Sequence, residues 1–340
     1  MIIAAIGLAA LATAYVFYWF LLARTIGQDI SAWTALRRSE GYAVSYSQSP
    51  IEGFPLSVTV RFRDPQIVSP GGRWRWRGAE TRLRVLPWAP YDLQFAAPGS
   101  HGLSIAGNPT RELSIESRRL GLDLHLKDGV LPDRFALTLI GASVHDSRAG
   151  NATIERLASE VRLPWPPAHD PSRSDFDLLA GVVRFTLPAG LEAPLGREIS
   201  ALHLAAQIMG ALPDAAPRQA LEAWSTAGGD VELRQAELSW GPLWAKGDGT
   251  LAFDTAMQPL FAGSVAVAGL GEALDRLAEA NLVQAGSARM AKLVFATLAT
   301  PPPEGGAPQV KLPLTIQDGY VYTGPIRLAP LKPLDWSWLP

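Results

Sequence analysis

The chain of 340 residues contains no cysteine, which excludes disulfide bonds, thiolate metal sites and cysteine nucleophiles. It also has no excess of charge. The 30 Lys and Arg residues are balanced by 32 Asp and Glu residues, and the formal net charge is −2. Binding to nucleic acid through bulk positive charge is therefore not expected. Because an envelope compartment does not require cysteine, the location of the protein has to be inferred from other features.

Histidine is sparse, and familiar catalytic motifs are missing. None of the five histidines belongs to the helical His-Glu-x-x-His pattern that holds zinc in metalloproteases. Ser100-His101 lacks the Gly-x-Ser-x-Gly elbow of a serine hydrolase. We therefore predict no metal, no cofactor and no catalytic residue, and expect a non-enzymatic protein. A hydrolase or glycan-modifying enzyme stays open as an alternative, since sequence order does not show which distant residues meet in space.

The N-terminus predicts a transmembrane anchor over residues 1–25. Ile2 to Ala23 carry no charge, and about 20 apolar residues of helix span the roughly 30 Å hydrocarbon layer. A cleaved signal peptide is the alternative, but it would have a basic start, a shorter apolar run and a small-residue cleavage site. Tyr15, Tyr18 and Trp19 instead resemble an interfacial aromatic belt at the far end of an uncleaved span.

Residues 26–40 are predicted to form an amphipathic linker helix. Ile26, Ile30, Trp33 and Leu36 recur at steps of three and four, which places them on one face of a helix. We expect this helix to lead the chain away from the bilayer.

Beyond residue 40 the apolar residues alternate with polar ones, and Gly or Pro separates the runs. This pattern predicts about twenty antiparallel strands, each buried on one face. Four prolines within residues 164–171 indicate an extended connection between an N-terminal β region (41–164) and a C-terminal β region (172–340). The second region should contain helices near 219–227 and 270–298. The predicted fold is mainly β: curved antiparallel sheets that form a groove or a sandwich, with a few covering helices.

The most unusual segment is Arg73 to Arg77, in which arginine and tryptophan alternate. In a strand, both tryptophans would lie on one face and the three arginines on the other. Seven arginines against two carboxylates between residues 61 and 84 produce a local charge of +5. Such a surface could bind lipid headgroups or phosphate. The alternative is a solvated edge whose arginines prevent sheet-to-sheet aggregation. The candidate headgroup-binding residues are Arg61, Arg63, Arg73, Trp74, Arg75, Trp76, Arg77, Arg82 and Arg84.

Several segments resemble a bacterial family of unestablished activity, domain of unknown function 2125. They are Gly53-Phe54-Pro55 with the strand that follows, Ala220 to Gly229, Trp240 to Leu251, and Leu312 to Pro325. The resemblance implies an envelope protein anchored in the inner membrane with its body in the periplasm. A more distant similarity is to AsmA-like proteins, whose strands form an open apolar groove implicated in phospholipid movement.

These expectations combine into a functional hypothesis. The leading one is non-enzymatic lipid binding or transfer along an apolar β groove, with the inner membrane and phospholipid as partners and nucleic acid excluded. The alternative is a structural or scaffolding envelope protein that binds other proteins. Arg24, Arg37 and Arg38, which follow the apolar span, favour a cytoplasmic body by the positive-inside rule and so oppose the periplasmic location that the family implies.

Overall fold

The computed structural model describes residues 2–107, 109–127, 131–163, 174–213, 215–301 and 307–336. The chain divides into two compact units, Met1–Ala152 and Thr153–Pro340. Both units consist mainly of antiparallel strands, and the described residues contain seventeen strands in all. The protein is therefore β-rich, as its alternating pattern predicts.

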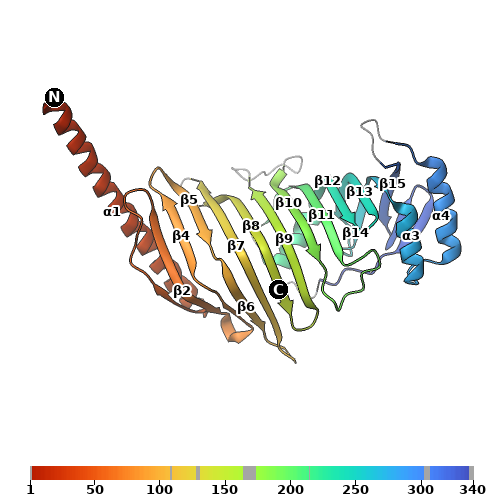
Figure 1. The fold of residues 1–340 in the computed structure, drawn as a ribbon, viewed down its shortest axis with the longest axis horizontal. Helices are drawn as coiled ribbons and strands as arrows, with labels where there is room; N and C mark the ends of the chain where they lie inside the picture. The colour runs from red at the N-terminus through yellow and green to blue at the C-terminus, as the bar shows by residue number, and fades with distance from the viewer. Residues whose placement is uncertain are drawn as a thin grey trace. The chain divides into compact units, whose positions relative to one another are not determined.

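The first unit begins with one long helix, α1 (Ile2–Ser39). Its N-terminal turns stand clear of the strands of this unit, and its C-terminal half lies against them (Figure 1). The helix has 38 residues, which corresponds to about 57 Å of length. It is long and apolar enough to cross a membrane. The expected span and linker helix are thus a single uninterrupted helix, because no Gly-Pro break or cap separates them.

Eight strands make up the sheet of the first unit. One short 3₁₀ turn, η1 (Pro70–Gly72), lies between the second and the third strand. Strand β2 pairs with β1, with β3 through its second half and with β4 through its first half. The long β7 likewise pairs with β6, β5 and β8. The strands are β1 (Ala43–Gln48), β2 (Val58–Val68), β3 (Trp74–Arg77), β4 (Thr81–Leu86), β5 (Ala89–Ala96), β6 (Gly99–Ile105), β7 (Arg111–Lys127) and β8 (Leu131–Asp146).

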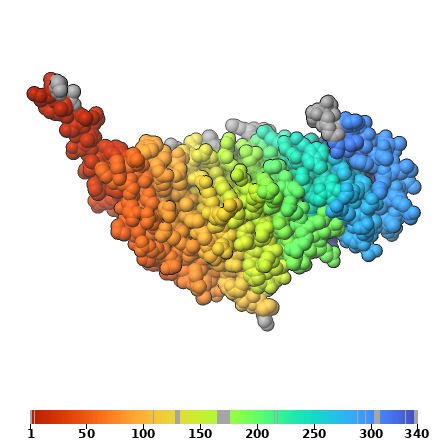
Figure 2. Space-filling view, in the orientation of Figure 1, coloured from red at the N-terminus to blue at the C-terminus, as the bar shows by residue number. Residues whose placement is uncertain are grey.

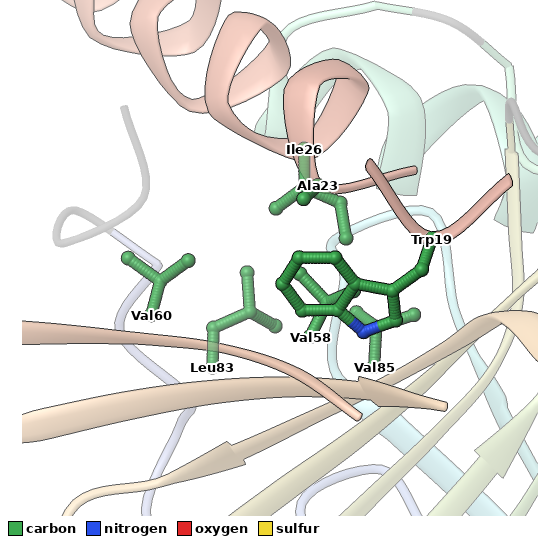
Figure 3. Close-up of a cluster of buried hydrophobic side chains, with 7 residues drawn as sticks. All are labelled: Trp19, Ala23, Ile26, Val58, Val60, Leu83 and Val85. Carbon is green, nitrogen blue, oxygen red and sulfur yellow. The ribbon is translucent and has the colours of Figure 1, made fainter. Parts of the chain in front are cut away.

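The core of this unit lies between α1 and strands β2 and β4. Trp19, Ala23 and Ile26 of the helix face the strands, and the indole ring points at the valine side chains beneath it (Figure 3). The strand residues of the cluster are Val58, Val60, Leu83 and Val85. Strand register explains why they meet: Val58 lies opposite Val85, and Val60 lies opposite Leu83. Alternation along the two strands therefore collects four apolar side chains on one face.

The second unit is a meander of nine strands in which each strand pairs antiparallel with the next. The strands are β9 (Gly150–Arg162), β10 (Ser174–Thr186), β11 (Glu198–Met209), β12 (Asp230–Trp240), β13 (Leu243–Phe253), β14 (Pro259–Ala268), β15 (Gln309–Gln317), β16 (Tyr320–Thr323) and β17 (Ile326–Pro330). The first three residues of β9 precede Thr153, where the unit begins.

Three helices interrupt the meander of the second unit. Helix α2 (Pro217–Thr226) follows β11, and its Trp224 is buried and donates a hydrogen bond of 2.8 Å to the Met209 carbonyl. Helices α3 (Leu270–Glu279) and α4 (Ala285–Leu298) lie between β14 and β15, where Lys292 pairs with Asp275 at 2.7 Å. All three fall within or close to the ranges that periodicity indicates.

The division between the units falls after Ala152, whereas the sequence suggests a boundary at the prolines. The proline segment 164–171 lies outside the described residues. The strands on either side of it, β9 and β10, pair with each other over nine residue positions, so both belong to one unit. A run of prolines predicts that a strand stops; it does not distinguish a hairpin connection from a domain linker.

Val60→Ala should destabilise the first unit by about 2 kcal/mol, because Val60 is 0% exposed and its methyl groups contact the helix–sheet core. Thermal unfolding of the full-length protein in detergent measures the effect. Arg84→Ala is the matched control: it alters the opposite face of the neighbouring strand and should change stability by about 0.5 kcal/mol or less. Equal effects of the two substitutions would contradict the assignment of the core.

Candidate functional site

An apolar groove of about 810 Å³ runs between α1 and the sheet of the first unit. It is open to solvent on one side, and its volume falls in the range of roughly 300–1,000 Å³ that is usual for small-molecule sites. Figure 2 shows this unit in space-filling form, with the first turns of α1 projecting beyond the strands. A packed sandwich would leave no such space, so in this unit the groove alternative of the sequence prediction is the one that fits.

The helical wall of the groove consists of residues from one face of α1. Leu22, Ile26, Ile30 and Trp33 follow one another at steps of four, four and three residues, and all of them line the groove. Ile26, Ile30 and Trp33 belong to the apolar stripe that the sequence assigns to a linker helix; its fourth member, Leu36, is exposed and does not line the groove. The stripe predicts an amphipathic helix, but not that the helix becomes one wall of a cavity.

Six strands provide the opposite wall. Their lining side chains are mainly apolar or aromatic. They include Val44 and Tyr46 of β1, Phe62, Pro65 and Ile67 of β2, Trp76 of β3, Thr81 and Leu83 of β4, Pro90, Tyr91, Leu93 and Phe95 of β5, and Leu126 of β7.

Hydrogen bonds hold α1 to the sheet at both ends of the groove. At the N-terminal end, Tyr15, Tyr18 and Trp19 donate to the carbonyls of Pro55, Pro87 and Ser57 at 2.5, 2.7 and 3.0 Å. At the other end, the hydroxyls of Thr34 and Tyr46 lie 2.9 Å apart, and Arg38 donates to the Val44 carbonyl at 2.8 Å.

The helix is therefore anchored on either side of the groove. These bonds use donors spread over six turns of α1, so they fix its direction along the sheet as well as its distance from it. The space between the two anchors is preserved because neither end of the helix is free to collapse onto the strands.

The arginine–tryptophan segment forms strand β3, and its two faces separate as alternation predicts. Trp76 lines the groove and stacks on His101 with ring centroids 5.9 Å apart, while Trp74 lies on the same face and contacts Tyr42. Arg73, Arg75 and Arg77 are exposed on the opposite face. Trp76 thus belongs to the groove, Trp74 lies on the same face, and the arginines lie on the other.

The other four candidate arginines also lie on the face away from the groove. Arg61 and Arg63 alternate with groove-lining Phe62, and Arg82 and Arg84 alternate with buried Leu83. The seven guanidinium groups, which we call the arginine face, are therefore together on one side of β2, β3 and β4. The structure does not bring these guanidinium groups to the groove, which lies on the other side of the sheet.

The arginine face is not the edge of a sheet. Strand β3 pairs with β2 on one side and with β6 on the other, so its backbone groups are already engaged. Protection of an exposed sheet edge, the alternative explanation for these arginines, therefore does not apply to those of β3. Arg61 and Arg82 lie directly opposite each other, and their like charges are offset by ion pairs to Glu52 at 2.9 Å and to Glu80 at 3.2 Å. Across the described residues no ion pair is found for the other five.

Charged groups are nearly absent from the groove itself. Asp29 is the one charged residue among those that line it, and it belongs to the helical wall. Among the described residues, no group of three or more His, Asp and Glu side chains could hold a metal ion. The lining therefore suits an uncharged, flexible apolar ligand better than a phosphate or a sugar.

The clearest pKa shifts occur outside the groove. In the first unit, hydrogen bonds from the Arg111 guanidinium and the Arg148 backbone hold the pKa of Asp146 well below its usual range. In the second unit, burial beside Glu232 raises the pKa of Asp230. Asp146 ends β8, and its bond to Arg111 joins β7 to β8, which is a structural role.

The fold and the groove together define a class of protein: a β-sheet protein in which a membrane-length helix also forms one wall of an apolar groove. The chain belongs to the family DUF2125, described as an uncharacterized protein conserved in bacteria, whose model matches residues 19–332. This confirms the family that the sequence motifs indicate. None of the curated proteins and none of the solved structures that were compared matches the chain.

The arginine face should bind anionic membranes in a salt-dependent manner. Arg75→Glu combined with Arg77→Glu should weaken binding of the full-length protein, held in phosphatidylcholine nanodiscs, to phosphatidylglycerol vesicles by tenfold or more, because each basic residue near such a surface contributes about 1 kcal/mol. Co-sedimentation measures the binding. The control is Arg119→Glu combined with Arg134→Glu, which reverses two exposed charges elsewhere in the unit. Equal binding by all three proteins would contradict a headgroup role.

Proposed function

We propose that this protein binds lipid non-enzymatically, holding an acyl chain in the groove between α1 and the sheet of the first unit. The observation that carries the proposal is the continuity of α1, which is an apolar membrane-length helix at one end and the wall of an apolar groove at the other. A lipid chain that leaves the bilayer along this helix meets apolar side chains without first crossing water.

The dimensions of the helix support this path. A span of about 20 residues ends near Leu21, and Trp33 lies twelve residues further along the same helix. At about 1.5 Å per residue, the groove thus extends about 18 Å beyond the hydrocarbon layer. Burial of methylene groups over that length contributes about 0.8 kcal/mol for each one removed from water.

Photocrosslinking tests the proposal. The full-length chain, reconstituted with a phospholipid that carries a diazirine on its acyl chain, should crosslink at groove residues beyond the span, such as Trp33 and Ile67. Thr81→Trp places a large ring on the groove face of β4 and should reduce these crosslinks several-fold. Mass spectrometry of the digested protein locates the crosslinked residues.

Ser114→Trp is the matched control for this experiment. It adds the same ring at an exposed position of β7 outside the groove, and it should leave the crosslinks unchanged. Crosslinks confined to residues 2–24 would mean that lipid surrounds the anchor but does not enter the groove.

A second candidate function is that of an envelope scaffold, and the arginine face favours it. Five of its arginines are without an ion pair in the described part of the chain, and they point away from the groove, so an acidic partner protein could bind there while the groove stays empty. Loss of binding to an acidic partner in the doubly substituted arginine variant, together with a groove that does not crosslink, would favour the scaffold.

We further propose that the anchor resides in the inner membrane with the body in the periplasm. Of the three arginines that oppose this topology, Arg37 pairs with Glu40 at 2.7 Å and Arg38 bonds to the Val44 carbonyl. Both are thus part of the folded body, and Arg24 alone follows the span closely, which weakens the positive-inside signal.

Because the chain has no cysteine, a single introduced thiol reports the topology. In cells with a permeabilised outer membrane, a membrane-impermeant maleimide should label Ser114→Cys to the same extent as after complete lysis. Labelling that requires disruption of the inner membrane would place the body in the cytoplasm.

A further inference from the structure

Two loops of the first unit expose large apolar side chains beside the N-terminal half of α1. In the β1–β2 loop, Phe54 and Leu56 are 51% and 63% exposed, and in the β4–β5 turn Trp88 is 64% exposed. Neither tip contains a charged residue: the sequences are Gly-Phe-Pro-Leu-Ser over 53–57 and Leu-Pro-Trp-Ala-Pro-Tyr over 86–91. Burial of three such side chains within the protein would be usual, so their exposure requires an explanation.

The two loops are fixed at a defined height along α1. Tyr15 donates its hydroxyl proton to the Pro55 carbonyl, and Tyr18 donates to the Pro87 carbonyl, so each tip is bonded to the helix next to its exposed apolar residue. Phe54 also contacts the rings of Trp19 and Phe20, with centroids 5.4 and 6.5 Å away.

That height coincides with the end of the apolar span. A span of about 20 residues that begins at Ile2 ends near Leu21, and the first charged residue of the helix is Arg24. The bonded positions 15 and 18 therefore lie within the last two turns of the span. Phe17 and Phe20, which are 65% and 60% exposed, lie on the same turns.

We infer that both tips insert into the membrane, so that Phe54, Leu56 and Trp88 enter the boundary between headgroups and acyl chains and seat the body on the bilayer. The inference rests on the proposed membrane anchoring of α1. The partner of the two tips is the lipid bilayer itself, because the tips adjoin the helix that crosses it. Aromatic side chains are enriched at this depth, and the absence of charge removes the main cost of insertion.

Insertion also defines where lipid enters the groove. Pro90 and Tyr91, two and three residues after Trp88, line the groove, and so does Leu22, three residues after Trp19. The tips therefore bring the near end of the groove to the level of the acyl chains. A lipid could pass from bilayer to groove beside Trp88 while its chain stays in contact with apolar side chains.

The absence of cysteine makes a site-specific test direct. Leu56→Cys and Trp88→Cys, each labelled with the fluorophore NBD in the full-length protein in phosphatidylcholine vesicles, should be quenched several-fold by lipids that carry a shallow nitroxide. Ala106→Cys is the matched control, because Ala106 is exposed. Its backbone N–H donates to the Arg73 carbonyl, and Arg73 follows the 3₁₀ turn whose Pro70 lies near Gly41, just past the C-terminal end of α1. This control should show little quenching. Leu11→Cys, in the span, should be quenched by deep nitroxides.

The outcomes separate the inference from the proposed anchoring. Quenching at residues 56 and 88, but not at 106, supports insertion. Quenching at residue 11 with residues 56 and 88 no more quenched than residue 106 overturns insertion and leaves the anchor standing. Absence of quenching at residue 11 overturns the anchor and the insertion together.

Discussion

The packing of α1 against β2 and β4 is the interaction on which the first unit depends. Trp19, Ala23 and Ile26 meet two pairs of apolar residues that strand register places opposite one another, and the indole N–H is satisfied by the Ser57 carbonyl. The contact removes apolar surface from both partners and leaves no buried donor of the indole unpaired. At this contact, the apolar part of the helix that could span a membrane meets the part that packs against the strands.

Because α1 is continuous, this contact has consequences at a distance. Its position determines the height of the two apolar tips, the wall of the groove and the direction in which the helix leaves the sheet. A flexible linker after the span would let the body move freely relative to the span, and neither a groove wall nor a fixed loop height would result. The bonds from Thr34 and Arg38 complete the arrangement by holding the other end of the helix.

Strand alternation separates two chemistries that the sequence presents together. Over Arg73 to Arg77, neighbouring residues point to opposite faces, so the tryptophans lie on the face of the apolar groove, which Trp76 lines, and the arginines face solvent. A single ligand therefore does not contact both faces of β3. The proposed contacts with lipid chains on one side and with anionic groups on the other would therefore be independent of each other.

Local features of the sequence were sufficient for much of the fold. The apolar run from Ile2 to Ala23, the stripe through Ile30, the alternating strands and the covering helices near 219–227 and 270–298 all depend on residues close together in the chain, where period and propensity act directly. The two faces of β3 also depend on local sequence, since alternation is a property of a single strand. The family motifs, too, are contiguous.

The groove, the separation of the arginine face from it, and the bonding of the two apolar loop tips to α1 were decided only by the tertiary structure. Each depends on which segments become neighbours: Tyr15 and Tyr18 bond to loops 40 and 69 residues away, and β2 divides its pairing between β3 and β4. The division of the chain after Ala152 has the same origin, because it depends on strand pairing rather than on the prolines that the sequence makes conspicuous. Long-range pairing is set by the packing of whole elements, and a local pattern does not specify it.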